Sequence, residues 1–222
     1  MSHIQNEIKR ITATLPTNVR LVAVSKYQPI EKLMDAYACG QRLFGESHAQ
    51  ELKQKHECMP KDIEWHFIGH LQTNKVKYIA PFVSMIHAVD SYKLLCEINK
   101  QALKVNRIIP CLIQIHVAQE ETKFGFTPEE CKWFFQHEDW KNLKNVRIKG
   151  LMCMATNTND AHIIREEFHK AHALFQEIKN TIFVDSEDFS ECSWGMSDDY
   201  PIAIEEGSTL IRVGSNIFGA RM

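Results

Sequence analysis

Short apolar runs rich in β-branched residues alternate with stretches of helical spacing along the whole chain. Such runs, bounded by turn-forming residues, predict strands. From these runs, together with the strand-like segments 42–45 and 192–195, we expect eight strands, at residues 21–25, 42–45, 64–68, 83–89, 108–117, 146–152, 192–195 and 209–213.

Helices are predicted between these strands, where apolar residues recur every three or four positions. The clearest covers residues 161–179. Thr127, Pro128 and Glu130 have the order expected of a helix start, with a capping hydroxyl, a first-turn proline and a returning carboxylate. Further helices are expected at residues 4–14, 30–39, 46–55, 74–80, 91–105 and 200–206.

This alternation is typical of a parallel sheet covered by helices. Eight βα-like units and an extra N-terminal helix within 222 residues predict a single α/β domain, residues 1–222, folded as a (β/α)8 barrel of the TIM type. An open doubly wound sheet is the alternative. A dinucleotide-binding version of it is disfavoured, because no Gly-x-Gly-x-x-Gly follows the first strand. Residues 185–191 are expected to form an acidic surface loop.

Composition narrows the class of protein. Lys and Arg number 26 and Asp and Glu 28, which gives a net charge of -2 and no support for a nucleic-acid or anionic-membrane partner. No apolar run reaches the roughly 20 residues that span a bilayer, and the first residues lack a signal-peptide pattern. The seven cysteines include no Cys-x-x-Cys pair. We therefore expect reduced thiols and a cytoplasmic protein.

Functional groups of such barrels gather at the carboxyl ends of the strands. Lys26 directly follows the first predicted strand. Desolvation or a nearby cation would lower the pKa of its amine and make it a nucleophile for an aldehyde. A solvated lysine at a strand end is the alternative.

Two loops after the last two strands could bind a phosphate. Ser197 offers a hydroxyl before a short helix, and Gly214 and Ser215 follow the last strand. A plain helix cap is the alternative for Ser197. Arg212 is expected to face the barrel interior or mouth, with a structural ion pair as its alternative. In a closed barrel these loops adjoin Lys26, so an aldehyde with a phosphate tail, such as pyridoxal phosphate, would join them.

Seven segments carry a family resemblance: Ala23–Lys26, Phe44–Glu46, His66–Lys75, Thr122–Gly125, Gly150–Met152, Gly195–Asp198 and Arg212–Gly219. Through them the chain resembles the pyridoxal phosphate homeostasis proteins, which are similar to the barrel domain of alanine racemase. The resemblance covers nearly the whole chain.

The resemblance implies that the cofactor is pyridoxal 5′-phosphate and that Lys26 forms an aldimine with it. It further implies that Ser197, Gly214 and Ser215 hold the phosphate, that Arg212 faces the pyridine nitrogen, and that Met152, Ser193 and Met196 line the cofactor. Ser47 stands where the family usually has asparagine, and we do not count it as a ligand. His66 and His70 lack a third metal ligand, so no metal site is expected.

An arginine at the ring nitrogen leaves that nitrogen unprotonated, which suits racemase chemistry at best. Racemisation also needs acid and base groups on both faces of the substrate. The related racemases take one of these from a second domain, for which eight units leave no room here. We therefore expect a monomeric, non-enzymatic carrier that buffers the cofactor in vitamin B6 homeostasis and passes it to apoenzymes. The alternatives are a pyridoxal-phosphate-dependent amino-acid racemase or decarboxylase, and a barrel without a ligand.

Overall fold

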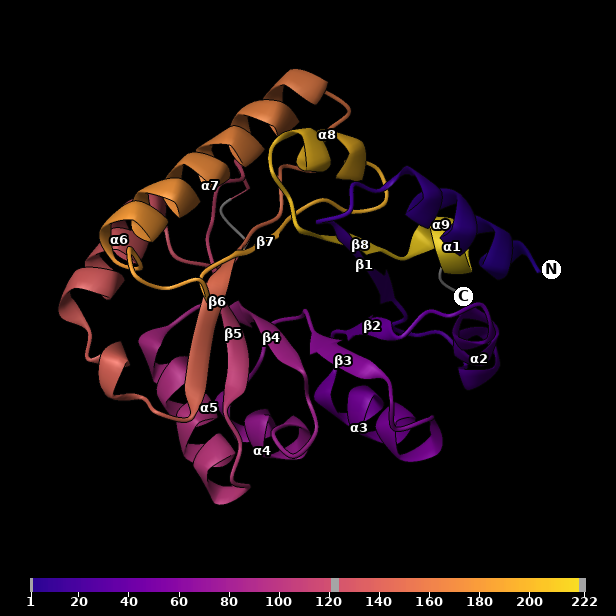
Figure 1. Cartoon of the computed structure of the whole chain (residues 1–222), viewed down its shortest axis with the longest axis horizontal. Coiled ribbons are helices and arrows are strands. Elements are labelled where there is room, and N and C mark those ends of the chain that lie inside the picture. The colour runs from indigo at the N-terminus through magenta and orange to yellow at the C-terminus, as the bar shows by residue number, and fades with distance from the viewer. Residues whose placement is uncertain (1, 121–123, 220–222) are drawn as a thin grey trace.

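The chain folds as a closed barrel of eight parallel strands surrounded by helices (Figure 1). The computed structural model describes residues 2–120 and 124–219. Each strand pairs with the next in chain order, and the first closes onto the last. The strands are β1 (Arg20–Val24), β2 (Leu43–Glu46), β3 (Glu64–Phe67), β4 (Met85–Val89), β5 (Ile109–Gln114), β6 (Val146–Met152), β7 (Glu191–Ser193) and β8 (Leu210–Val213).

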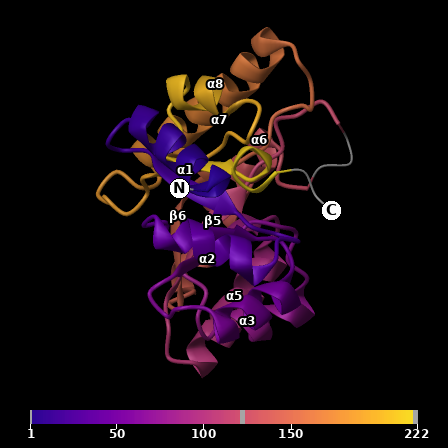
Figure 2. The same cartoon turned by 90° about the vertical axis from the view of Figure 1, so that its right-hand side faces the viewer.

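Helices follow the strands as the barrel prediction requires. They are α1 (His3–Thr14), α2 (Ile30–Ala38), α3 (Ala49–Cys58), α4 (Val76–Ile79), α5 (Tyr92–Lys104), α6 (Pro128–His137), α7 (Ala161–Thr181), α8 (Tyr200–Glu205) and α9 (Ser215–Phe218), with 3-10 turns η1 (Thr73–Lys75) and η2 (Trp140–Asn142). The extra helix α1 packs against α2 and α9, beside the closure of the barrel (Figure 2). Within the described ranges, no helix is long and apolar enough to cross a bilayer.

The prediction of a helix starting at Glu46 is wrong. Glu46 is the last residue of β2, where it pairs with Phe67 and accepts a backbone hydrogen bond from Ile68, and α3 begins only at Ala49. The capping signal at Thr127 is confirmed, since its side chain and that of Glu130 form a reciprocal capping box. The barrel ladder, which sequence spacing cannot show, determined where β2 ends.

The segment 185–191 is less exposed than an acidic surface loop should be. Phe189 is fully buried and stacks on Phe175 and Phe183, at ring-centroid distances of 4.9 and 4.3 Å. Glu191 already belongs to β7. One aromatic side chain therefore ties this loop to the core.

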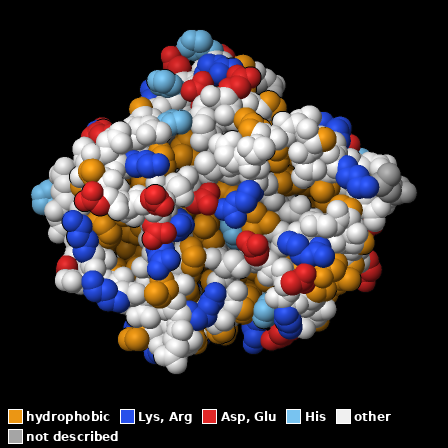
Figure 3. Space-filling view, in the orientation of Figure 1, with side chains coloured by type: hydrophobic (Ala, Val, Ile, Leu, Met, Phe, Trp, Pro, Cys, Tyr) orange, Lys and Arg blue, Asp and Glu red, His pale blue; other side chains and the backbone are white. Residues whose placement is uncertain are grey.

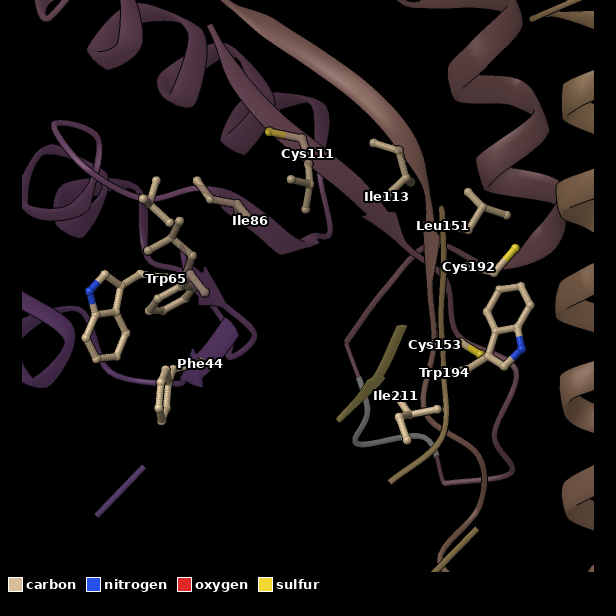
Figure 4. Close-up of a cluster of buried hydrophobic side chains, with 14 of the residues drawn as sticks. Phe44, Trp65, Ile86, Cys111, Ile113, Leu151, Cys153, Cys192, Trp194 and Ile211 are labelled. Carbon is tan, nitrogen blue, oxygen red and sulfur yellow. The ribbon is translucent and has the colours of Figure 1, made fainter. Parts of the chain in front are cut away.

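Two apolar layers are separated by the strands. The larger lies between the sheet and the helices, and Figure 4 shows part of it, with Phe44, Trp65 and Ile86 from successive strands. The smaller fills the barrel interior and consists of Val22, Leu43, Met85, Leu112, Met152 and Leu210. Because side chains alternate along a strand, residues two apart share a face. Val24, at the end of β1, therefore lies on the same face as Val22, and Arg212 lies on the same face as Leu210.

Charged side chains of both signs are interspersed over the face in Figure 3, with hydrophobic atoms visible between them. That face shows no extended patch of a single charge. The mixture agrees with the nearly balanced totals of acidic and basic residues.

Candidate functional site

A cavity of about 250 Å³ opens where β1, β7 and β8 end. Six of the eight residues predicted to bind the cofactor line it: Lys26, Met196, Ser197, Arg212, Gly214 and Ser215. The closure of the barrel brings these residues together, because β8 pairs with both β1 and β7. Sequence positions almost 190 residues apart thus share one pocket.

Lys26 lies in a sharp turn after β1. The next residue, Tyr27, has a φ of 63°, a left-handed conformation that is uncommon for a non-glycine residue. The Tyr27 N–H donates a hydrogen bond to Glu51 Oε1 on α3, at 2.7 Å. This contact stabilises the turn and so fixes the backbone from which the Lys26 side chain extends.

The other side of Lys26 is held by a buried ion-pair network. Lys55 Nζ on α3 donates to the Ser25 carbonyl oxygen at 2.7 Å, to Glu46 Oε1 at 2.8 Å and to Glu51 Oε1 at 2.7 Å. The Ser25 hydroxyl donates to the same Glu46 oxygen at 2.6 Å. One of these hydrogen bonds binds the backbone before Lys26, and another binds Glu51, which itself binds the backbone after Lys26. Sequence analysis missed this network, whose only local signal is the i, i+4 spacing of Glu51 and Lys55.

Burial controls the charge of Glu46. Its side chain has no exposed surface, and this desolvation raises its pKa from about 4.5 to about 7, although Lys55 and Ser25 act in the opposite direction. Its second oxygen, Oε2, is buried without a hydrogen-bond partner among the described residues. A proton on Glu46 is therefore easily accommodated near neutral pH.

Ser197 joins the two loops of the predicted phosphate site. Its hydroxyl oxygen accepts a hydrogen bond from the Gly214 N–H at 3.2 Å, and its carbonyl oxygen accepts one from Asn216 Nδ2 at 2.9 Å. The residue before α8 is Asp199, whose carboxylate accepts a hydrogen bond from the Met196 N–H at 2.5 Å. Ser197 is thus not a plain cap of α8, and its contacts reach the loop after β8.

Several backbone donors of these loops remain unused. The N–H groups of Ser197, Asp198, Ser215 and Asn216 have no acceptor within the described part of the chain. Gly214 lets the loop approach β1 closely, since a Cβ there would lie 3.0 Å from the Val24 carbonyl oxygen. Unused N–H groups around a cavity are suited to binding a phosphate.

Arg212 is a buried cation with no carboxylate at ion-pair distance in the described part of the chain. Only 4% of its surface is exposed. Nη1 donates to the carbonyl oxygen and hydroxyl of Ser193 at 2.7 and 2.6 Å, and Nη2 donates to the Cys153 carbonyl oxygen at 2.9 Å. Burial lowers its pKa, but a guanidinium remains charged in proteins. Arg212 forms no ion pair within residues 2–120 and 124–219, so the predicted interior orientation holds and the ion-pair alternative does not.

Met152 and Ser193 do not line this cavity. Both are almost fully buried and pair with each other between β6 and β7. Met154, two residues further towards the rim, lines the cavity instead. Met152 and Ser193 therefore lie one layer deeper, and Ser193 reaches the cavity only through its contact with Arg212.

The remaining sequence features lie around the rim. Ser47 lines this cavity and also a neighbouring cavity of about 510 Å³, whose lining includes His70 and Lys75. His70 contacts Asp90, with 2.9 Å between Nδ1 and Oδ2. Thr122 and Lys123 of the family motif lie outside the described residues.

Comparisons with known proteins agree with this geometry. Residues 1–222 match the family model for the alanine racemase N-terminal domain. A relative from Aquifex aeolicus, named pyridoxal phosphate homeostasis protein, is 39% identical over 91% of this chain and 87% of its own length. A relative of the same name from Schizosaccharomyces pombe is 40% identical over 92% and 85%. The chain belongs to the pyridoxal phosphate homeostasis protein family.

Solved structures resemble this family member over nearly its full length. PipY of Synechococcus elongatus, solved without PLP, is 32% identical and superimposes with a TM-score of 0.90 over 97% of this chain and 100% of its own. The same protein with PLP bound gives a TM-score of 0.88 over the same shares. Alanine racemase from Bartonella henselae, at 14% identity and a TM-score of 0.72 over 99% of this chain and 59% of its own, shares the fold.

The raised pKa of Glu46 predicts a pH-dependent stability for this family member. Its contribution is fully present below about pH 4.5 and is lost as the pH rises through about 7, because the folded state holds the proton more tightly than the unfolded chain. Relative to Glu46→Gln, we expect the wild-type free energy of unfolding to fall by on the order of 1–3 kcal/mol between about pH 5 and 8.

Urea denaturation at several pH values measures this difference. Glu57→Gln, which changes an exposed position on α3, the helix that carries Lys55, is the matched control and should follow the wild type at every pH. A wild-type free energy of unfolding that, relative to that of Glu46→Gln, stays constant or rises with pH would contradict the assignment.

Proposed function

We propose that this protein binds pyridoxal 5′-phosphate reversibly at Lys26 and buffers it, a role in vitamin B6 homeostasis. The observation that carries the proposal is the single cavity lined by an amine, a buried guanidinium and two loops with unused N–H donors. The names of the relatives, and the PLP-bound structure of PipY, support the same ligand.

The residues present fit this ligand group by group. Ser197, Ser215 and the unused amides around them would hold the phosphate. Arg212 would donate to the ring nitrogen, since only three of its five N–H groups are engaged within the described residues. Met154 and Met196 would contact the ring. When bound, the cofactor supplies an aldehyde that reacts reversibly with an amine.

Arg212 also favours a carrier over an enzyme. Strong electron withdrawal by this cofactor needs a protonated ring nitrogen, which a neighbouring carboxylate usually maintains. Arg212 has no proton-accepting role and adds a positive charge, so it opposes protonation of that nitrogen. We therefore propose that the protein has no robust catalytic activity. An amino-acid racemase or decarboxylase is the competing function.

The proposal includes the organisation of the protein and its recipients. The chain covers 100% of PipY but 56–59% of the alanine racemase chains, which supports one barrel, residues 1–222, as the binding domain. We propose that the barrel acts as a monomer and passes the cofactor to apoenzymes, with an accessible mouth at Lys26 for the transfer.

Borohydride trapping tests the role of Lys26. After addition of pyridoxal phosphate and reduction, peptide mapping should find the stable adduct at Lys26 in the wild type and no adduct in Lys26→Ala. Lys75→Ala is the matched control, because Lys75 lines the neighbouring cavity rather than this one, and it should be labelled like the wild type. An adduct at another lysine in the wild type would refute the proposal.

Calorimetric titration tests the phosphate site. Ser197→Ala should weaken binding of pyridoxal phosphate about tenfold, or about 1.4 kcal/mol, because a hydrogen bond to a charged group is lost. Binding of pyridoxal, which lacks the phosphate, should not change. Ser84→Ala, just before β4 at the opposite end of the barrel, is the control. Equal weakening of both ligands would show that Ser197 does not serve the phosphate.

A further inference from the structure

Four polar side chains form a buried chain across the barrel interior, beneath the cavity. His66 Nδ1 lies 2.7 Å from His87 Nε2, and His87 Nδ1 lies 2.9 Å from the Ser193 hydroxyl oxygen. Arg212 Nη1 donates to the same oxygen at 2.6 Å. None of the four residues is more than 4% exposed. They come from β3, β4, β7 and β8, so the chain links opposite sides of the barrel.

The number of N–H and O–H donors in this hydrogen-bonded row of four side chains follows from their charge states. Burial lowers the pKa of His66 to about 3 and that of His87 well below its usual range, so both imidazoles are neutral and each carries one N–H. Arg212 can only donate. Ser193 has one hydroxyl proton, and within the described residues its oxygen contacts only Arg212 and His87.

Only one direction of the hydrogen bonds gives the Ser193 hydroxyl proton an acceptor. If His87 Nδ1 carried the proton, the Ser193 oxygen would accept from both neighbours and its own O–H would have no acceptor. A buried polar hydrogen without a partner is costly. If Ser193 instead donates to His87 Nδ1, then His87 Nε2–H donates to His66 Nδ1, and each hydrogen bond has one donor and one acceptor.

This direction fixes the geometry of Arg212. With its hydroxyl proton directed towards His87, Ser193 presents lone pairs to the guanidinium, which its carbonyl oxygen and that of Cys153 also hold. We propose that His87 and His66 are positioning residues: His87, oriented by His66, accepts the Ser193 hydroxyl proton and fixes that hydroxyl, whose oxygen holds Arg212 with its remaining N–H groups available to the cavity. The consequence for the ring nitrogen rests on the proposed function, whereas the hydrogen-bond direction does not.

Nitrogen NMR of the cofactor-free protein tests the direction itself. With ¹⁵N-labelled histidine, both His66 and His87 should be neutral Nε2–H tautomers at about pH 7, with Nδ1 unprotonated. Assignment comes from His66→Gln and His87→Asn. An Nδ1–H tautomer at His87, or a charged imidazole at either position, would overturn the proposal, and neither result depends on the ligand.

A pair of variants tests the effect on binding. His87→Leu removes the acceptor for the Ser193 hydroxyl and should weaken pyridoxal phosphate binding roughly tenfold, while binding of the 1-deaza analogue, which has carbon in place of the ring nitrogen, should stay within about twofold. His87→Asn, whose side-chain oxygen can replace Nδ1, should restore most of the affinity.

The outcomes separate the two proposals. Unchanged affinity in His87→Leu, or equal loss of both ligands, would overturn the positioning role. If the wild type did not bind pyridoxal phosphate, the proposed function would fail, while the tautomers would still decide the hydrogen-bond direction. The NMR measurement uses wild-type protein for the tautomers, so it applies even if His87→Leu does not fold.

Discussion

The site depends on keeping a buried guanidinium in place without a carboxylate partner. Removing a cation from water is costly, and an ion pair is the usual compensation. Here neutral oxygens of Ser193 and Cys153 hold Arg212 instead. No carboxylate lies within ion-pair distance of Arg212 in the described structure, although the Asp199 carboxylate is near enough to interact with it, so its positive charge is not paired by direct contact. The carrier proposal follows from that charge, since a cation at the ring nitrogen opposes the protonation that strong amino-acid chemistry requires.

A second buried cation, Lys55, stabilises the backbone next to Lys26. Lys55 is paired with Glu46 and Glu51 and bonds the backbone next to Lys26, in the layer between barrel and helices. Arg212 belongs to the barrel interior, so the two cations lie on opposite faces of the strands. The strands thus separate Lys55, which stabilises the turn that carries Lys26, from Arg212, which lines the cavity.

Much of the fold and of the candidate site was predictable, because both depend on the periodicity of apolar residues and on the order of strands and helices along the chain. The alternation of strand-like and helical segments predicted all eight strands, and position at or near strand ends identified Lys26, Ser197 and Arg212 as groups at one rim. The depth of a side chain within the barrel was not predictable. Met152 and Met154 are two residues apart, and only the closed barrel shows that Met152 is buried beside Ser193 whereas Met154 lines the cavity. The contacts of Lys55 and the histidine chain also required the fold, because their members come from separate elements.

Exchange of the α-proton of amino acids in deuterated water tests the central claim most directly. The loaded wild-type protein, mixed with an excess of each common L-amino acid, should exchange no faster than free pyridoxal phosphate at the same concentration. Steady exchange through many turnovers that is lost in Lys26→Ala would contradict the account and show an enzyme.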